Sequence, residues 1–281
     1  MERWILLGMA PVFLGFIAWE AWYLHYRRPG GRSRYTWPDT LSNAALALMH
    51  QAGDGLAWAL VIGLYWQVYR HRLCDVPTRW WSIVLLFVAQ DFFYYFFHRA
   101  SHRVRWMWAS HVTHHSSNRL NLSTAFRQSL TYPISGMWLF WLPLAWIGFA
   151  PPAIVAVVAV NLALQFFVHT EVVGRLGWLE SVLNTPSHHR VHHARNARYI
   201  DRNYAGVFIV WDKLFGSFTE EDPALPCEYG LVTPIHTHHP LALTFHEWGA
   251  MWRDCARRQS LGSRLTQVFG PPERAHAGKR D

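Results

Sequence analysis

Ten of the 18 histidines in this chain are gathered at four places, in a pattern that is typical of a metal site. Three places are short boxes, and the fourth is one histidine at the end of an apolar run: His98-Arg-Ala-Ser-His102, His111-Val-Thr-His114-His115, His188-His189-Arg-Val-His192-His193, and His169. Residues three or four positions apart lie on one face of a helix, so the imidazoles of one box can converge on one point. The spacing therefore predicts metal binding by histidine.

The boxes offer more imidazoles than one metal ion can use, since a structural zinc ion takes four ligands. Adjacent histidines such as His114 and His115 point about 100° apart on a helix, so they can serve two different ions. The HxxHH spacing starts at His111 and again at His189, which argues against a chance cluster of surface histidines. Two metal ions are the simplest interpretation.

The sequence around the boxes excludes several common metal enzymes. A zinc peptidase would carry HExxH, which is missing here. Ferritin-like di-iron sites use Glu together with a pair of ExxH sequences, and the chain lacks such a pair. Imidazole suits zinc, copper, iron and nickel, so the ligand type leaves the metal open. Iron in an all-histidine dinuclear site would allow the protein to activate dioxygen and attack an inert C–H bond of a lipid.

Long apolar runs predict helices that span a membrane. The runs lie at residues 4–26, 41–69, 80–98, 132–150 and 151–169. A helix needs roughly 20 residues to cross a bilayer, so we predict an all-α integral membrane protein with four or five transmembrane helices. The polar segments 98–131 and 170–261 are expected to form a cytosolic helical cap that carries the boxes. Residues 1–261 would then form one domain, and 262–281, rich in Gly, Pro and charge, a flexible tail.

The basic residues predict how these helices are oriented. All but four of the 26 lysines and arginines fall on the side of the bilayer that would carry the boxes, the exceptions being Arg3, Arg70, Arg72 and Arg79. Positive loops stay in the cytoplasm. We therefore expect the boxes to face the cytoplasm, in a bacterial inner membrane or, in a eukaryote, in the endoplasmic reticulum.

The net charge of +8 does not point to nucleic acid, because the bases lie mostly beside predicted membrane segments and no nucleic-acid motif accompanies them. Cys74, Cys227 and Cys255 are scattered and include no CxxC pair. They predict neither a disulfide framework nor a zinc ribbon.

Other polar residues near the boxes are candidates to assist the site. A metal-bound histidine usually donates its second ring N–H to a carboxylate or a carbonyl. Asp91 lies two helical turns before His98 on the same face, inside an apolar run, where an ionisable residue suggests a function. The further candidates for such a supporting role, or for an extra ligand, are Glu171, Asn184, Asp212 and His188. His236, His238 and His239 form a partial cluster that we interpret as surface residues.

Several segments resemble one family of membrane oxygenases. Besides the boxes, the segments are Asp91-Phe-Phe-Tyr-Tyr-Phe-Phe-His98-Arg99, Asn121-Leu-Ser-Thr-Ala-Phe-Arg127-Gln128-Ser129, Val168-His169-Thr170-Glu171, Asn184-Thr-Pro-Ser-His188, Asn203-Tyr-Ala-Gly206 and Trp211-Asp212-Lys213-Leu-Phe-Gly216. Together they resemble the fatty acid hydroxylase and sterol desaturase superfamily of di-iron membrane enzymes, and within it the alkylglycerol monooxygenase-like branch. The resemblance runs from about residue 37 to residue 240.

This resemblance implies a helical membrane bundle capped by helices that carry two iron ions. By matching positions, the implied iron ligands are His98, His102, His111, His114, His115, His169, His189, His192 and His193. It also implies molecular oxygen as co-substrate and a separate source of electrons. The ether-lipid branch uses tetrahydrobiopterin, whereas the sterol and acyl branches take electrons from ferredoxin or cytochrome b5-type partners.

The leading functional hypothesis is an O2-dependent lipid monooxygenase that hydroxylates an alkyl, acyl or sterol chain, including cleavage of the ether bond of alkylglycerols. A lipid or sterol desaturase on the same site is the first alternative, because substrate placement decides between the two outcomes. A membrane metal transporter or sensor is the alternative of another class. It would distribute its ligands through the bilayer, whereas these ligands gather at one face.

Overall fold

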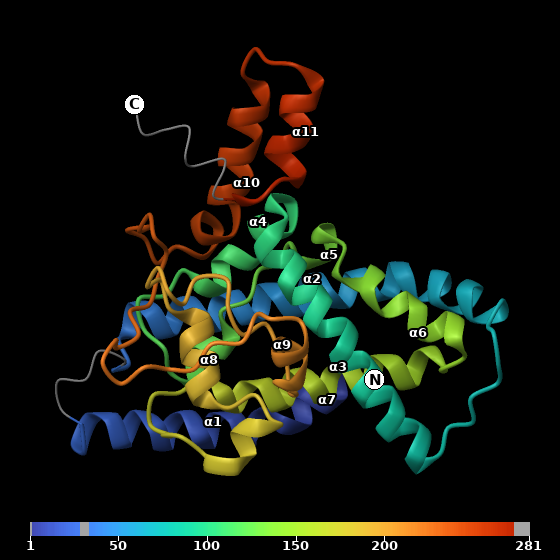
Figure 1. Ribbon diagram of the computed structural model, residues 1–281, viewed down its shortest axis with the longest axis horizontal. Helices are drawn as coiled ribbons and strands as arrows, with labels where there is room; N and C mark the ends of the chain where they lie inside the picture. Colours follow the sequence, from blue (N-terminus) through green and yellow to red (C-terminus); the bar gives the residue numbers. More distant parts are fainter. Residues whose placement is uncertain (1, 29–33, 273–281) are drawn as a thin grey trace.

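The computed structural model describes residues 2–28 and 34–272, and within them every regular element is a helix. The all-α prediction is confirmed, since the only β-type pairings in this part of the chain are two isolated bridges, Leu183 with Phe208 and Ala194 with Tyr229. Figure 1 shows long helices that run along the molecule and a shorter helical hairpin that projects away from them.

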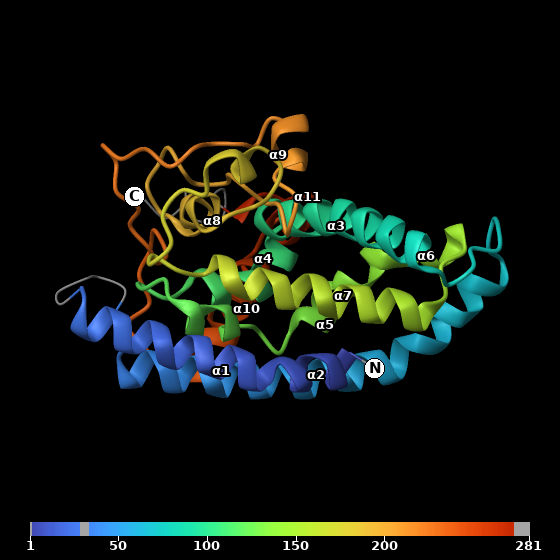
Figure 2. The ribbon, with the colours of Figure 1, turned by 90° about the horizontal axis from the view of Figure 1, so that it is seen from below.

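Four long helices form the membrane-type part of the fold. They are α1 (Glu2–Tyr26), α2 (Trp37–Arg70), α3 (Trp80–Arg103) and α7 (Pro151–Gln165), the last continued by the 3-10 turn η3 (Phe166–Val168). Helix α7 packs against both α1 and α3, and Figure 2 shows it between them. Its residues are mostly small or β-branched, which suits a helix that is covered on two sides.

Three helical segments are long and apolar enough to cross a membrane: Trp37–Arg70, Trp80–Arg103 and Pro151–Val168. Only 11% of the apolar window of α2 is buried inside the protein, and Leu56, Leu60 and Trp66 are exposed as lipid-facing residues would be. The protein is therefore a membrane protein. Helix α3 continues to Arg103, beyond the apolar run that ends at Phe97, so His98 and His102 lie on the same helix.

The prediction of one membrane helix over 132–150 is wrong, because this segment is broken into short pieces. They are α5 (Tyr132–Ser135), the 3-10 turn η2 (Met137–Trp141) and α6 (Leu142–Ile147). Gly136 takes a left-handed φ of +87° and ends the first piece. The apolar piece Met137–Ile147 measures roughly 17 Å at the rise of an α-helix, too little for a hydrocarbon core of roughly 30 Å.

The broken segment nevertheless runs between the same two ends of the bundle as α3. At one end, Tyr132 contacts a histidine of the second box, as described below. At the other end, Leu73 donates from its backbone N–H to the Trp146 carbonyl at 2.8 Å, just past the C-terminus of α2. Trp141 and Leu144 are buried in the main hydrophobic core together with Tyr65 of α2.

Most of the remaining helices gather at the end of the bundle where α3 stops, whereas α9 (Val210–Leu214) packs beside the middle of α3, with Trp211 against Phe92. The others are α4 (Arg105–His115), α8 (Pro186–His193), α10 (Pro240–Ala256) and α11 (Leu261–Phe269), with the 3-10 turns η1 (Leu122–Phe126) and η4 (Gly177–Ser181). Helices α3 and α4 are separated only by Val104, whose extended backbone turns the chain. The two histidine-bearing helices therefore meet at a bend.

The expected flexible tail differs from the structure at its first residues. Ser260 caps α11 by accepting from the Ser263 N–H, and Val268 packs against the cluster of Ala109, Trp248 and Met251. The tail was predicted from its Gly, Pro and charge content, but residues 261–269 form a helix that contacts α10 through Val268, while Leu261, Leu265 and Phe269 are exposed. Residues 273–281 of the predicted tail lie outside the described residues.

The α10–α11 hairpin is anchored by a buried arginine at the start of α4. The Arg105 side chain is fully buried and donates to Glu247 at 2.7 Å, to Asp254 at 2.9 Å and to Gln267 at 3.0 Å. Its own backbone N–H donates to the Gly270 carbonyl at 3.0 Å. Because Arg105 begins the helix that carries the second box, the hairpin and that box are fixed to each other.

Candidate metal centre

The nine histidines expected as ligands lie in two buried clusters. The first cluster contains His98, His102, His111, His115 and His192, and the second contains His114, His169, His189 and His193. Within each cluster, one nitrogen atom of every imidazole lies within 4.8 Å of the others. All nine side chains are at most 6% exposed. Each cluster therefore has the size of a coordination shell around one ion.

Helical geometry divides the boxes between the clusters. On α4, His111 and His115 are one turn apart and face the first cluster, whereas His114 faces the second. Helix α8 does the same, with His192 in the first cluster and His189 and His193 in the second. The structure thus places adjacent histidines in different clusters, as their angular separation on a helix requires.

The nitrogen–nitrogen distances match those between ligands of one metal ion. In the first cluster, His111 Nε2 lies 3.0 Å from His98 Nε2 and 3.1 Å from His115 Nε2. In the second, Nε2 of His189 lies 2.9 Å from that of His169 and 3.0 Å from that of His193. Two nitrogens bound to one ion at about 2.1 Å are roughly 3 Å apart when their bonds stand at right angles. The spacing fits bound metal.

Backbone carbonyls fix which ring nitrogen carries the proton. Four Nδ1 atoms lie at hydrogen-bond distance from carbonyl oxygens: His98 to Tyr204 at 2.8 Å, His114 to Arg127 at 3.2 Å, His169 to Gln165 at 2.8 Å and His192 to Arg202 at 3.0 Å. A carbonyl only accepts, so each Nδ1 must donate, and Nε2 of the neutral ring is left with a free lone pair. Lone pairs that face one another at 3 Å repel unless a cation lies between them.

Two imidazole nitrogens without a hydrogen-bond partner among the described residues also favour metal binding. Nε2 of His102 and Nε2 of His192 are buried and lack a hydrogen-bond partner in the described part of the protein. Both belong to the first cluster. An unpaired buried polar atom is costly, and a metal ion in the cluster would satisfy both at once.

Burial keeps these imidazoles neutral. It lowers the pKa of His111, His114 and His115 well below its usual range, and repulsion among neighbouring imidazoles adds to the effect. The pKa values of His189, His192 and His193 are lowered in the same way, and burial lowers the pKa of His169 to about 4. Neutral imidazole is the form that binds a metal ion.

Two contacts to the first cluster were missed in the sequence. The Tyr132 hydroxyl lies 2.6 Å from His111 Nδ1, and an Asp201 carboxylate oxygen lies 3.5 Å from His102 Nδ1. Tyr132 opens an apolar run 21 residues after His111, and no spacing rule connects them. Asp201 has a left-handed φ of +61°, close to Asn203 at +56°. The Asp-x-Asn sequence is a signal for such a turn, although it does not reveal which side chain the turn meets.

Asp91, Asn184 and Asp212, expected to bind the histidines directly, instead bind backbone groups of a loop that contacts them. Asp212 accepts from the backbone N–H of Tyr204 at 2.8 Å and of Ala205 at 2.7 Å. Asn184 donates to the Ala205 carbonyl at 2.7 Å. These three side chains therefore hold the loop that contains Tyr204, whose carbonyl accepts a hydrogen bond from His98. None of the three is hydrogen-bonded to a clustered imidazole in the described structure.

Asp91 binds residues within the segment 207–211, which follows Tyr204 in the chain. It accepts from the backbone N–H groups of Val207 at 2.8 Å and Phe208 at 3.0 Å, and from the Trp211 indole at 3.0 Å. A Cβ added at Gly206 would lie 2.7 Å from the Asp91 carboxylate, so only glycine allows this approach. Asp91 and His98 both face the loop 204–208, as expected from their positions two turns apart on α3.

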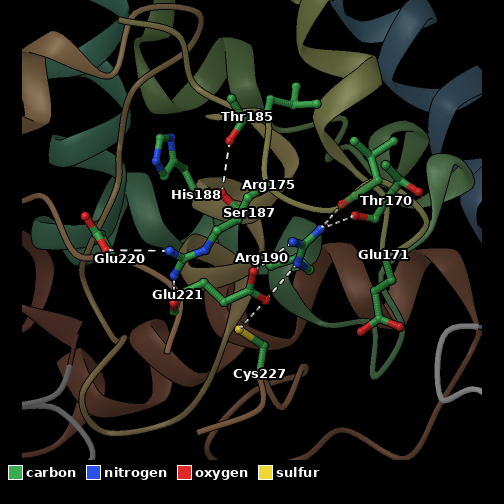
Figure 3. Close-up of polar contacts among 12 residues, drawn as sticks. Thr170, Glu171, Arg175, Thr185, Ser187, His188, Arg190, Glu220, Glu221 and Cys227 are labelled. Carbon is green, nitrogen blue, oxygen red and sulfur yellow. Dashed lines mark hydrogen bonds and ion pairs between the residues drawn. The ribbon is translucent and has the colours of Figure 1, made fainter. Parts of the chain in front are cut away.

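His188 and Glu171 lie outside both clusters. The His188 ring packs against Phe218 with ring centres 5.3 Å apart, and Glu171 accepts from the Tyr229 hydroxyl at 2.8 Å. Figure 3 shows both side chains apart from the neighbouring Arg190. In the described structure neither residue joins the nitrogen atoms that could bind metal.

Arg190 ties the third box to the chain after His169. Its guanidinium donates to both carboxylate oxygens of Glu221, at 2.8 and 2.7 Å, and to the Thr170 and Val173 carbonyls at 3.1 and 2.7 Å (Figure 3). Thr170 in turn donates from its hydroxyl to Glu20 of α1. The position of His169 relative to α8 is therefore fixed by an ion pair and its backbone acceptors.

Comparison with known proteins agrees with this geometry. The fatty acid hydroxylase family model matches residues 83–217, a span that contains all nine clustered histidines. The human alkylglycerol monooxygenase is 40% identical over 271 residues, which cover 93% of this chain and 58% of that protein. Its Xenopus tropicalis counterpart is 44% identical over 199 residues, or 70% and 43% of the two chains.

A bacterial relative is more distant. The ornithine lipid hydroxylase OlsE of Rhizobium tropici is 30% identical over 145 residues, which cover 50% of this chain and 44% of that protein. The chain spans about half the length of the curated relatives it matches. No solved structure matches it. The family model, the relatives and the two histidine clusters agree, and the chain belongs to the fatty acid hydroxylase superfamily.

Proposed function

We propose that this protein is a membrane-bound, O2-dependent lipid monooxygenase whose nine clustered histidines hold two iron ions. The observation that carries the proposal is the pair of buried all-imidazole clusters, of five and four rings, at the end of apolar helices. Two such ions would supply the activation of dioxygen. The proposed ligands are the nine residues named above, and His188 is not among them.

The protein itself contributes shielding and orientation. Every clustered imidazole is at most 6% exposed, so water is kept from the reacting groups. The Tyr204 and Arg127 carbonyls hold His98 and His114 in the tautomer that leaves Nε2 free. Asp91, Asn184 and Asp212 act through the loop that carries Tyr204, and outer partners of this kind tune metal sites.

The substrate is proposed to be a lipid taken directly from the bilayer. The centre lies at the end of α3, immediately after the apolar part of that helix, which is where a chain carbon near a lipid headgroup would be found. The names of the animal relatives favour alkylglycerols. Hydroxylation of the carbon beside the ether oxygen would give a hemiacetal, which breaks into an aldehyde and a free glycerol hydroxyl.

Electrons would come from a separate donor, either a pterin such as tetrahydrobiopterin or a ferredoxin or cytochrome b5-type protein. We further propose that the histidine-bearing end faces the cytoplasm of a bacterial inner membrane. Supporting this orientation, all lysines and arginines except Arg3, Arg70, Arg72 and Arg79 lie on that side of the apolar runs.

Metal analysis combined with oxygen uptake tests the function. The purified protein should hold two iron ions per chain and consume O2 when a reductant and an alkylglycerol are supplied. His114→Ala and His192→Ala should abolish uptake, whereas His71→Ala, at the exposed far end of α2, should not. Product mass separates a gain of one oxygen from the loss of two hydrogens that a desaturase would cause. A folded protein that binds no metal, or full uptake in His114→Ala, would contradict the proposal.

A further inference from the structure

A polar cavity of about 360 Å³ opens beside the metal centre. Its walls come from the start of α2, the segment directly after α4, and the irregular segment before α10. The residues that matter here are Asp39, Ser117, Arg119, Arg127, His236 and His238. Its volume lies within the range of small-molecule sites, roughly 300–1,000 Å³, and no catalytic or structural role described above uses it.

Two residues in the cavity wall are directly linked to the histidine clusters, one through the chain and one through a hydrogen bond. Ser116, in its wall, directly follows His115 of the first cluster. Arg127, also in its wall, accepts from His114 of the second cluster through its carbonyl at 3.2 Å and donates to Ser116 Oγ at 2.9 Å. Ser116, Arg127 and the histidines themselves would thus lie between a molecule in the cavity and the proposed ions.

The cavity and the apolar part of α3, residues 80–97, lie on opposite sides of the centre. His50 of α2 is level with the first cluster, since its ring contacts Tyr132, which contacts His111. Asp39 lies eleven residues earlier on the same helix, roughly 16 Å along its axis. The longer part of the apolar run of α2, residues 51–69, extends from His50 in the opposite direction, whereas residues 41–49 extend toward the cavity. The centre therefore stands between the cavity and most of the apolar length of α2 and α3.

The groups around the cavity suit an anionic ligand. Arg119 and Arg127 bring two guanidinium groups, and the exposed imidazoles of His236 and His238 stand at the mouth. Among the described wall residues Asp39 is the one acid; it pairs with Arg127 at 3.3 Å and accepts from Ser117 at 3.0 Å, so the two arginines leave this wall with a net positive charge. Guanidinium groups with neighbouring hydroxyls are a common setting for phosphate.

We propose that this cavity binds the phosphorylated glycerol headgroup of the lipid substrate. The inference rests on the proposed lipid oxygenation and adds the part of the substrate that the protein recognises. With the headgroup in the cavity and the tail directed toward the membrane, the carbons nearest the glycerol lie at the centre. The cavity would thereby select the position of attack, since it fixes the distance between the headgroup and the oxidised carbon.

The test is direct binding of sn-glycerol 3-phosphate to the purified full-length protein, measured by calorimetry. The double variant His236→Ala/His238→Ala should weaken binding at least about tenfold, as the loss of two hydrogen bonds to the phosphate implies. Arg119→Gln should do the same. His239→Ala is the matched control, because this histidine is adjacent and exposed but lies outside the cavity wall, and it should bind like the unmodified protein.

Kinetics give a second, independent readout. The double variant should raise KM for a phosphorylated alkylglycerol about tenfold at unchanged kcat, and should leave KM for an unphosphorylated long-chain alcohol unchanged. Absence of glycerol phosphate binding, or equal binding by the double variant, would overturn the proposal. Equally tight binding of inorganic phosphate would also overturn it in favour of a free-phosphate site. Because binding needs no turnover, a protein that binds the probe but consumes no oxygen would contradict the proposed function alone.

Discussion

His114 and His115 are neighbours in the chain, but their imidazoles belong to different clusters. The same division separates His192 from His193. Each pair supplies one imidazole to each cluster, so α4 and α8 both contribute ligands to the two clusters. The two ring pairs also touch, since the His115 and His193 rings stack with centres 4.5 Å apart.

This division predicts that substitutions of adjacent histidines remove different metal ions. His192→Ala should deplete the first cluster, and His193→Ala the second, each leaving about one ion per chain and lowering turnover by at least about 100-fold. Metal analysis with a spectroscopic signature for each ion measures the outcome. If both variants lose the same ion, or both retain two, the division into five and four ligands is wrong.

Asp212→Asn is predicted to affect the first cluster only. The substitution weakens the acceptor of the Tyr204 and Ala205 N–H groups and shifts the carbonyl that holds His98. Loss of such an outer partner typically lowers metal affinity about 10- to 100-fold. Competition with a chelator would show one ion released earlier. Glu220→Gln is the control, since this exposed side chain pairs with Arg175 at 3.9 Å and belongs to neither cluster, and it should leave both affinities unchanged.

Arg105→Ala is predicted to destabilise the protein strongly. Removing this arginine leaves Glu247 and Asp254 without their buried cation, and breaking a buried ion pair typically costs about 3–5 kcal/mol. Thermal unfolding in detergent should show a midpoint lower by about 10 °C. Arg195→Ala removes a half-exposed pair with Glu228 and should cost less than about 1 kcal/mol. Similar midpoints for the two variants would show that the α10–α11 hairpin is not anchored through Arg105.

The metal-free protein is predicted to lose stability in mild acid. The folded pKa values of the buried histidines are below the ordinary value of about 6.5, with His169 at about 4. Below pH 6.5 the unfolded chain therefore binds protons that the folded chain does not. Stability is full above pH 6.5 and is lost as the pH falls toward 4, by at most about 1.4 kcal/mol per imidazole at pH 5.5.

Unfolding midpoints at pH 7.5 and pH 5.5 measure this effect in protein treated with a chelator. The metal-loaded protein is the control, because bound ions hold the imidazoles neutral to lower pH. It should show a smaller decrease over the same interval. Equal midpoints of the metal-free protein at the two pH values would show that the clusters are already protonated or open to water.

The spacing of the boxes was sufficient to find the clustered histidines of α3, α4 and α8, because helical periodicity fixes which residues share a face, whereas the inclusion of His169 came from the family resemblance. The sequence also located the long apolar helices, whose hydrophobic runs exceed what a soluble core needs. It could not show that Gly136 breaks the segment after Tyr132, since glycine is also common within membrane helices. The docking of α11 was missed because it depends on contacts with α10 and with Arg105.

The partners of the imidazoles were the least predictable part of the site. His98 and His169 donate to the carbonyls of Tyr204 and Gln165, and a backbone carbonyl is present at every position whatever the side chain. Asp91 was found as an ionisable group in an apolar helix, but its target, the loop after Tyr204, lies more than 110 residues away. Only the folded chain shows that Asp91 and Asp212 support the same loop.

The clusters also differ in when a growing chain can complete them. Once residue 115 has been made, four of the five histidines of the first cluster exist, whereas the second has only His114. The other three arrive later, first His169 and then His189 and His193 of α8, which completes the second cluster almost 80 residues after His115. During synthesis from the N-terminus, a first ion can therefore be held before the second cluster exists. Assembly of the centre has a built-in order, and a chain that stops before α8 would have one partly formed site and no second site at all.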